Sequence, residues 1–372
     1  MNQPDNLEEN QIKQVHGLLL GWYARQGRDL PWRTTSDPYS ILVSEIMLQQ
    51  TQVDRVLPKY REFLERFPTL AQLAEAATAE VIRAWAPLGY NMRAVRLQAI
   101  ARQVLAEYDG KIPADEAELL KLKGVGRYTA GALACFAYRR QVPTVDTNIR
   151  RVLQRMFVGI EREAAPLSEQ HSWELARQVL PPDRAYEWNQ ALMDLGATIC
   201  TATTPACEVC PLQQVCAAYK ELGEHALFPS GKDLRLLVQQ QKQRPAKSGR
   251  QQPTATASEA QEALARPAVP GPLTKVAEAT SAYKTVPFTS TNRYFRGRVV
   301  DALRALAPGE RLSLPELGPQ VKADFSAAED MAWLSRLTEE LARDGLIALH
   351  HASGEPAGKL QPAESLLLVS LP

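Results

Sequence analysis

ELLKLKGVGRYTAGALACFAYRRQVPTVDTNIRRVL, residues 118–153, contains a tight glycine turn between two expected helices. The first helix is expected to end at Lys123 and the second to begin near Arg127, so that Gly124-Val125-Gly126 forms the turn. Two glycines let the backbone approach a ligand closely, and the N–H groups that open the second helix can bind an anion such as phosphate. Lys121, Lys123 and Arg127 place positive charge around the turn. For an isolated Gly-Val-Gly, a plain corner between two helices is the simpler interpretation.

Asp146 lies in the segment VDTNIRR, twenty residues after Gly126, where an apolar stretch leads into another expected helix. Aspartate is a favoured N-cap, because its carboxylate accepts hydrogen bonds from the first helical N–H groups and complements the helix dipole. A carboxylate held near a phosphate-binding turn can equally face a sugar carbon that becomes positive while its bond to a base breaks. The residues alone leave both interpretations open.

Four of the five cysteines lie close together in CTATTPACEVCPLQQVC, residues 200–216, with the spacing C-x6-C-x2-C-x5-C. Thiolates bind soft metals, and four of them in a short loop can surround one centre. Structural zinc sites usually combine two cysteine pairs a dozen or more residues apart, whereas only Cys207 and Cys210 form such a pair here. The spacing favours an iron–sulfur cluster over zinc without excluding zinc. The fifth cysteine, Cys135, lies in the apolar stretch AGALACFAY and is expected in the core.

Bulk composition is that of an ordinary globular protein: 372 residues, 45% hydrophobic and 23% charged, with a formal net charge of +1. Because the charge is balanced, any basic surface must be local. The polar, acidic start MNQPDNLEEN lacks the features of a secretory signal, and no apolar run approaches the ~18 residues of a membrane span. We therefore expect a cytoplasmic protein with no membrane partner, in which disulfides are disfavoured.

Helical periodicity extends from Val15 to about Leu227. Composition then changes, and residues 229–291 are rich in Gln, Ala, Pro, Ser, Thr and Lys, which favours a disordered linker. Helical patterns return from Tyr294, and LSLPELGPQV (312–321) is expected to be a short helix. LIALHH (346–351) and SLLLVSLP (365–372) indicate two strands. Three short helices followed by a hairpin predict a small α+β, winged-helix-like module over residues 292–372.

The glycine turn with its following aspartate, together with the cysteine loop, resembles the helix–hairpin–helix base-excision glycosylases that carry an iron–sulfur cluster. The resemblance covers about residues 15–228 and assigns residues 1–228 to a glycosylase region. It implies an all-α fold of two helical lobes around a DNA-binding cleft. The six-helix lobe spans about residues 30–140, and the iron–sulfur lobe combines the N-terminal helix with residues 141–228. It also implies that the turn contacts DNA through Lys123, Gly124, Val125, Gly126 and Arg127. The same resemblance implies a [4Fe–4S] cluster, whose ligands would be Cys200, Cys207, Cys210 and Cys216.

Two residues indicate one branch of this superfamily. Tyr128 stands where endonuclease III-like members carry the lysine that attacks the sugar, so no lyase step through this residue is expected. Glu45 interrupts the apolar stretch ILVSEIMLQQTQV, residues 41–53, which by itself is also compatible with an exposed polar face. SEIMLQQTQV is similar to the motif of MutY-type adenine DNA glycosylases, in which this glutamate is the catalytic acid. Partial burial would raise the pKa of such a carboxyl.

The same resemblance implies a wedge that enters the duplex. Gln49, Gln50 and Thr51 would contact the base opposite adenine, and Tyr90 would stack into the helix. Asn91 departs from the pattern, which usually has a second tyrosine or a similar residue there. LPWR (30–33) and NQALMDLGATIC (189–200) also fit the family.

The implied activity is hydrolytic removal of adenine opposite 8-oxoguanine or guanine in double-stranded DNA by a monomer. In this scheme Glu45 protonates adenine, Asp146 stabilises the sugar cation, and Tyr128 and Asn148 orient these groups. Many MutY-type enzymes end in a Nudix-like domain that reads 8-oxoguanine. Residues 294–372 do not resemble one and suit either DNA binding or docking of a protein partner. Two alternatives are an endonuclease III-like pyrimidine glycosylase with lyase activity and a non-enzymatic iron–sulfur DNA-binding regulator.

Overall fold

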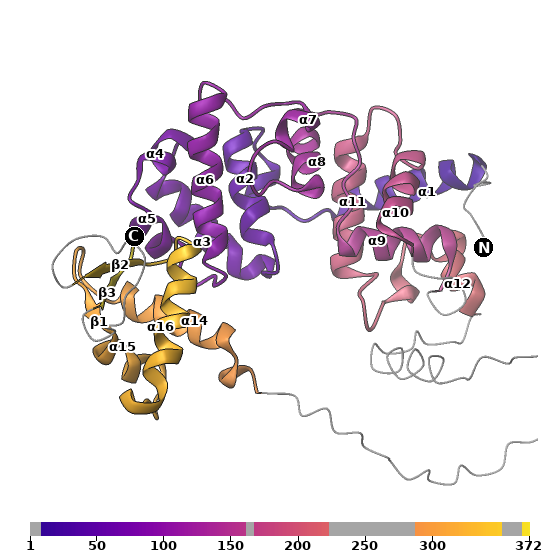
Figure 1. Ribbon diagram of the computed structural model, residues 1–372. Helices are drawn as coiled ribbons and strands as arrows, with labels where there is room; N and C mark the ends of the chain where they lie inside the picture. Colours follow the sequence, from indigo (N-terminus) through magenta and orange to yellow (C-terminus); the bar gives the residue numbers. More distant parts are fainter. Residues whose placement is uncertain (1–8, 161–166, 223–286, 352–366) are drawn as a thin grey trace, which may run out of the picture.

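The computed structural model describes residues 9–160, 167–222, 287–351 and 367–372, and these residues form three groups of helices, the last of which also contains strands (Figure 1). We refer to them as the hairpin lobe (31–137), the cluster lobe (9–26, 146–160 and 167–222) and the C-terminal module (287–351 and 367–372). Each group has a hydrophobic core of its own. The predicted linker lies outside the described residues over 229–286. None of the helices in the described ranges has the length and apolarity that crossing a bilayer requires.

The hairpin lobe consists of six helices and the four-residue helix α7. Their bounds, after a 3₁₀ turn η1 at Pro31–Arg33, are α2 Pro38–Leu48, α3 Val53–Arg66, α4 Leu70–Glu75, α5 Thr78–Trp85, α6 Met92–Glu107, α7 Glu116–Leu119 and α8 Arg127–Phe136. Asp37 caps α2 by accepting hydrogen bonds from the backbone N–H groups of Tyr39 and Ser40. Residues 41–47 of α2 are all buried, so the helix passes through the lobe and carries Glu45 into its interior.

The glycine turn joins α7 to α8. Helix α7 ends at Leu119, earlier than the predicted end at Lys123, because the chain continues through tighter turns such as Lys121 N–H to Glu118 O (3.1 Å). Gly124 has φ +96°, which side-chain-bearing residues rarely adopt, and a Cβ at this position would lie 2.4 Å from Arg96 Cδ. Both the backbone conformation and the close packing on α6 therefore require glycine at position 124.

The cluster lobe combines the start of the chain with residues that follow the hairpin lobe. Its elements are α1 Glu9–Gln26, α9 Thr147–Leu153, a π-helical turn Gln154–Val158, α10 Glu169–Gln178, α11 Ala185–Thr198, the 3₁₀ turns η3 Cys207–Val209 and η4 Gln213–Val215, and α12 Ala217–Leu222. Helix α1 packs on α11, where Val15 and Leu19 share one core with Trp188 (Figure 1). The chain thus leaves this lobe after α1, builds the hairpin lobe and returns.

The C-terminal module has the order helix, strand, two helices, two strands. Its elements are the 3₁₀ turn η5 Phe288–Ser290, α14 Asn292–Arg304, β1 Leu312–Ser313, α15 Leu314–Val321, α16 Ala327–Arg343, β2 Ala348–His351 and β3 Leu367–Ser370. The central strand β3 pairs antiparallel with both β1 and β2, with Val369 opposite Leu312 on one side and Leu349 on the other. This is the winged-helix-like arrangement that the sequence predicts.

Two details of the module correct the prediction. Leu312 and Ser313, expected at the start of a helix, form the strand β1. The helix α15 begins only at Leu314, because Ser313 is its N-cap and closes a capping box with Glu316. The expected linker extends too far, since residues 288–290 form η5 and the Thr291 hydroxyl accepts a hydrogen bond from Tyr294 N–H at the start of α14.

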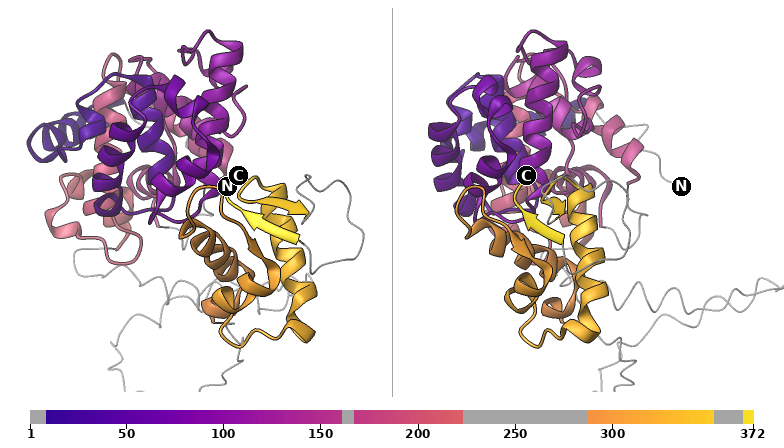
Figure 2. Two further views of the ribbon diagram at one scale, coloured as in Figure 1. Left: turned by 90° about the vertical axis from the view of Figure 1, so that its left-hand side faces the viewer. Right: turned by 60° about the vertical axis from the view of Figure 1, so that its left-hand side comes forward.

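The C-terminal module packs against the hairpin lobe at α5 and α6 (Figure 2). Ile82 of α5 is fully buried in the core of the module. The Ala79 N–H donates to the Pro372 carbonyl (2.9 Å), and Arg304 Nη2 donates to Asn91 Oδ1 (3.0 Å). These contacts place α14 beside the loop that carries Tyr90.

Candidate active site

Glu45 is the only charged residue of α2, and only 6% of it is exposed. Burial raises the pKa of Glu45 to about 7, because the charged form loses its hydration. The hydrogen bond from Tyr128 acts in the opposite direction, while the negative charge of Asp146 adds to the increase and Arg33 opposes it. A carboxyl with this pKa is present near neutral pH in both protonation states, so it can give and take a proton.

Three elements bring the polar groups of this site together. Glu45 comes from α2, Tyr128 from the first turn of α8, directly after the glycine turn, and Asp146 from the N-terminus of α9 in the other lobe. The Tyr128 hydroxyl donates a hydrogen bond to the Glu45 carboxyl. Burial and the charges of Glu45 and Asp146 raise the pKa of Tyr128 well above its usual value. The two predicted carboxyl groups therefore lie in one site where the lobes meet.

Asp146 is an N-cap, as one of the two interpretations of the sequence predicts. Its Oδ1 accepts from the Ile149 N–H (2.7 Å) and its Oδ2 from Asn148 Nδ2 (3.1 Å). Asn148 Oδ1 in turn accepts from Arg151 Nη1 (3.0 Å), and Arg151 Nε donates to the carbonyl of Cys200 (3.0 Å). Capping and these contacts fix the orientation of the Asp146 carboxylate while the residue stays partly exposed. The second interpretation, a carboxylate facing a substrate, is compatible with this geometry.

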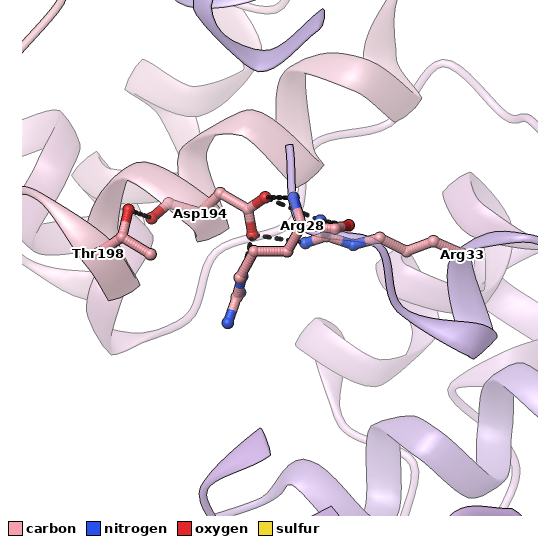
Figure 3. A network of polar contacts seen from close by, with 4 residues as sticks. All are labelled: Arg28, Arg33, Asp194 and Thr198. Carbon is pink, nitrogen blue, oxygen red and sulfur yellow. Dashed lines mark hydrogen bonds and ion pairs between the residues drawn. The ribbon is translucent and has the colours of Figure 1, made fainter. Parts of the chain in front are cut away.

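A buried ionic network joins the two lobes beside the site (Figure 3). Asp194 of α11 accepts from Arg33 at both oxygens (2.7 and 2.8 Å), and also from the backbone N–H and Nε of Arg28 (2.9 and 2.7 Å). Burial acts to raise the pKa of Asp194, but the hydrogen bonds and charges of the two arginines hold it below its usual value. Local sequence patterns did not indicate this network. The sequence contains one indication of it, an aspartate in the mostly apolar helix α11. That residue does not reveal its partner, because Arg33 is 161 residues away in the chain.

The predicted wedge residues lie in two loops with unusual backbone conformations. Gln50 has φ +56° and Tyr90 has φ +48°. Left-handed conformations of non-glycine residues cost about 1–3 kcal/mol each and persist only where the surroundings impose them. Asp109, Arg139 and Asp183 also have positive φ, so these conformations alone do not identify a functional surface.

The side chain of Arg93 contacts both loops, which local sequence patterns did not indicate. Its guanidinium is buried and donates to the carbonyls of Met47 (2.8 Å) and Gly89 (3.2 Å), the Thr51 hydroxyl (3.0 Å) and the carbonyl of Gln49. Arg93 therefore ties the loop after α2 to the loop before α6. Burial lowers the pKa of Arg93 to about 10. From sequence, an arginine within the amphipathic stretch of α6 gave no indication that it points inward.

The glycine turn leaves backbone N–H groups at the start of α8 uncapped by a side chain, but not every predicted cation lies beside them. Gly126 is the N-cap of α8 without a side-chain cap, so the first N–H groups of this helix are available to a ligand. A Cβ on Gly126 would meet nothing within 4 Å, and Lys123 is exposed beside it. Val125 turns its side chain into the core, so only its backbone faces the surface. Arg127 lies over the ring of Trp173 (4.1 Å), away from the position that the sequence suggests.

The four clustered cysteines lie near one another and are partly buried. Burial raises the pKa of Cys207 to about 11 and of Cys210 to about 12, and the neighbouring thiols add to both increases. Arg155 Nη1 lies 3.6 Å from Cys200 Sγ, and backbone N–H groups of Leu212 and Ala218 point at Cys210 and Cys216. Positive charge and N–H donors around four thiols suit thiolates that a metal centre holds in the ionised form.

The positions of these cysteines do not by themselves distinguish a cluster from a single ion. Among the described residues, no three Cys, His, Asp or Glu side chains converge closely enough to hold one metal ion. The fifth cysteine, Cys135, is fully buried in the hairpin lobe, as expected.

Both parts of the site lie in segments that match known protein families. Residues 43–178 match the HhH-GPD superfamily of base excision DNA repair proteins, and residues 200–216 match the iron-sulfur binding domain of endonuclease III. The second match selects iron–sulfur over zinc, so the chain carries a [4Fe–4S] cluster.

Relatives named adenine DNA glycosylase are similar over the larger part of the chain. The protein of Mycolicibacterium smegmatis is 47% identical over 215 residues, which cover 57% of this chain and 70% of that protein. The Mycobacterium tuberculosis protein is 49% identical over 197 residues, covering 52% and 64%, and the human protein is 41% identical over 230 residues, covering 59% and 42%. The matched segment thus spans about two thirds of the bacterial relatives and less than half of the human one.

Solved structures agree with the fold. A thermostable thymine-DNA glycosylase superposes with a TM-score of 0.54 at 32% identity, covering 57% of this chain and 98% of that one. Endonuclease III in a non-covalent DNA complex superposes with a TM-score of 0.51 at 22% identity, covering 58% and 98%, which supports the fold alone. The predicted fold class, an all-α region with a small α+β module, is confirmed.

Proposed function

The chain belongs to the adenine DNA glycosylase family, and we propose that it removes adenine from duplex DNA where adenine is paired with 8-oxoguanine or guanine. The observation that carries this proposal is the buried Glu45, with its pKa raised to about 7, hydrogen-bonded to Tyr128 and close to Asp146. A protonated carboxyl beside an ionised one is the arrangement that glycosidic bond cleavage needs. The HhH-GPD match covers the segment that contains all three residues.

Glu45 acts as the general acid. Adenine swings out of the duplex into the site between the lobes, which costs a few kcal/mol and less at a mispair. Glu45 then protonates the base, at N7, and so makes it a better leaving group. Burial supports this role, because it keeps a large fraction of Glu45 protonated at neutral pH.

Asp146 stabilises the sugar cation that forms as the base departs, by charge or by a transient covalent bond. The Ile149 N–H and the Asn148 amide hold its carboxylate in one orientation. Water then attacks the sugar, and Glu45, having given up its proton, accepts one from that water. Tyr128 positions Glu45 through its hydrogen bond, and Asn148 positions Asp146.

The DNA is held by the two loops and the glycine turn. Gln49, Gln50 and Thr51 contact the base opposite adenine, and Tyr90, which is 44% exposed, stacks into the duplex. The backbone from Gly124 to Gly126, with Lys123 beside it, binds a phosphate; Arg127 contributes through helix α8 and its contact with Trp173. The enzyme acts as a monomer.

The cluster, when bound by Cys200, Cys207, Cys210 and Cys216, cross-links the loop that follows α11. Arg151 connects this loop to the site, since it contacts both the Cys200 carbonyl and Asn148. The cysteine loop therefore helps to position Asp146.

Tyr128 indicates base removal without strand cutting, because a phenol cannot form the Schiff base that a lyase step requires. The test is incubation of the full chain with duplexes that carry adenine opposite 8-oxoguanine, adenine opposite guanine, or an oxidised pyrimidine, each with and without alkali. Adenine loss that gives strand breaks only after alkali supports the proposal. Direct nicking at the pyrimidine supports the lyase alternative, and binding without base loss supports the regulator.

Asp146→Asn gives a second test of the mechanism. The amide can still accept the capping hydrogen bond through its oxygen, so folding is preserved, while the negative charge is lost. We expect DNA binding to persist and excision to fall by at least 100-fold. Wild-type excision by this variant would contradict the role of Asp146.

A further inference from the structure

A cavity of about 890 Å³ lies between the hairpin lobe and the C-terminal module. The wall on the hairpin side includes the predicted wedge residues Gln49, Gln50 and Tyr90. The wall on the module side is α14, with Arg293, Gly297 and Arg298 among the lining residues. The module therefore extends the surface that we propose to meet DNA.

The cavity is strongly basic. Its lining contains six arginines and a single aspartate, Asp301. Some of these arginines have protein partners: Arg93 holds the wedge loops, and Arg296 forms ion pairs with Glu340 and Asp344. Arg293 and Arg298 are exposed on α14. Arg298 donates a hydrogen bond to the Gln320 carbonyl, but neither arginine forms an ion pair with a described residue, so their charge is available to a ligand. A cavity of this composition suits a polyanion.

Aromatic side chains lie among the arginines. The guanidinium of Arg293 lies 4.2 Å from the ring centre of Tyr90, and Phe288, which is 60% exposed, lines the same cavity. Arginine interleaved with exposed aromatic rings is typical of surfaces that bind nucleic acid strands. An acidic peptide would satisfy the charge but would not explain why these residues adjoin the wedge.

Within the module, the net charge of α14 is positive and that of α16 is negative. Helix α14 carries four arginines and one aspartate, whereas α16 carries four acidic residues and two arginines. Helix–turn–helix proteins usually insert the later helix of the motif into the major groove. The acidic character of α16 opposes such use and favours α14 as the surface of the module for DNA.

Gly297 makes α14 accessible to a close ligand. A Cβ on this residue would meet nothing within 4 Å, so neither packing nor backbone conformation requires glycine here. Glycine within a helix weakens it relative to alanine. A bare patch of helix backbone on the cavity wall allows a bulky group to approach.

We propose that this cavity is a second DNA-binding site, which holds the sugar–phosphate backbone of the strand opposite the extruded adenine. Arg293 and Arg298 contact phosphates, and the backbone passes over α14 at Gly297. Because the wedge lines the same cavity, the inference rests on the proposed function.

The test measures DNA binding by the full chain with Arg293→Gln and Arg298→Gln combined. The probe is a duplex with adenine opposite 8-oxoguanine whose adenosine carries a 2′-fluorine, which resists base loss. Two lost phosphate contacts are expected to weaken binding about tenfold and to reduce the slope of log K against log salt concentration by about 1.8. Arg336→Gln combined with Arg343→Gln removes the same charge from α16, outside the cavity lining, and is expected to retain wild-type affinity.

Gly297→Leu distinguishes a role of this residue in binding DNA from a role in stabilising the protein. The side chain has open space in the free protein, so this variant is expected to keep or raise Tm while it weakens binding of the same probe. Wild-type affinity and salt slope in both the double arginine variant and Gly297→Leu would overturn the inference. An equal loss in the α16 control would also overturn it, in favour of binding through α16. Failure of the proposed function is distinct, because the wild-type protein would then release no adenine from an unfluorinated duplex.

Discussion

The Tyr128 hydroxyl donates a hydrogen bond to the Glu45 carboxyl across the junction of α8 and α2. The glycine turn that positions α8 is thereby linked to the buried acid. This hydrogen bond stabilises the ionised form of Glu45 and so opposes the effect of burial on its pKa. The balance of the two leaves the pKa of Glu45 at about 7, within the range in which a general acid works best near neutral pH.

The rate of adenine excision is therefore expected to depend on the protonation of Glu45. The acid form is active, so the single-turnover rate is expected to fall as pH rises through about 7. Tyr128→Phe removes a contact that lowers the pKa of Glu45, so its descending limb is expected at higher pH than that of the wild type. Single-turnover rates between pH 5.5 and 9 measure both profiles. A descending limb that stays in place or moves to lower pH in Tyr128→Phe would contradict this link.

Glu45 is also expected to make folding stability depend on pH. Its pKa in the folded state, about 7, lies above the usual value of 4.5, so the folded protein favours the protonated form. That contribution is fully present below about pH 4.5 and is lost as pH rises through 7. Glu45→Gln cannot ionise. The free energy of unfolding of the variant minus that of the wild type is therefore expected to increase with pH, by roughly 3 kcal/mol at pH 8.

Urea unfolding of both proteins at pH 5 and pH 8 measures this gain, and Glu75→Gln, at an exposed position of α4, is the control for loss of a carboxyl. A difference between wild type and Glu45→Gln that is constant with pH would show that Glu45 is not buried as an acid. The same variant is expected to lose 10²–10⁴-fold in excision rate, the usual contribution of a general acid.

Asp194→Asn is expected to destabilise the protein by about 3–5 kcal/mol, because it leaves the buried guanidinium of Arg33 without its charged partner. This loss of stability is expected to arise at the junction of the two lobes, because the network spans that junction. Urea unfolding measures it. The control is Glu187→Gln on the same helix, which breaks an exposed ion pair with Arg184 and is expected to cost at most about 1 kcal/mol. Similar losses in both variants would contradict a special role for the buried network.

Local sequence patterns predicted the parts of the site that lie within short stretches. The glycine turn and the cysteine loop each place their functional groups within about seventeen residues, so spacing alone identified them as candidate sites. Spacing favoured an iron–sulfur cluster without excluding zinc, whereas the fold class and the [4Fe–4S] cluster were implied by family resemblance; the comparisons confirm both. The assignments of Glu45, Asp146 and the wedge residues came from family resemblance and stay predictions of their roles.

The contacts that hold these stretches in place were not predictable, because they join distant residues. Arg33 meets Asp194 across 161 residues, and Arg93 meets Met47 across 46. Nothing in the local pattern distinguishes a buried arginine from one on the exposed face of an amphipathic helix. The cavity beside Tyr90 depends likewise on how the module packs against α5 and α6, which periodicity does not report.

Arg93→Lys tests whether the wedge loops depend on this buried guanidinium. Lysine keeps the charge but has three donors at one point, so it cannot reach the carbonyls of Met47 and Gly89 and the Thr51 hydroxyl together. With acceptors left unpaired, a loss of about 2–4 kcal/mol in unfolding free energy is expected. Without these hydrogen bonds, Gln50 and Tyr90 are free to leave their left-handed conformations, so discrimination between a mispair and an A:T pair is expected to fall.

The binding measurement compares Kd for a duplex with adenine opposite 8-oxoguanine against Kd for the same duplex with A:T. The ratio of the two is expected to approach unity in Arg93→Lys, while the affinity for A:T changes little, because phosphate contacts at the glycine turn are untouched. Arg102→Lys, at an arginine of α6 that also donates to a carbonyl, that of Ala74 (2.9 Å), but is remote from the wedge, is the matched control. A discrimination ratio that survives in Arg93→Lys would mean that the wedge conformations are maintained by the loops themselves.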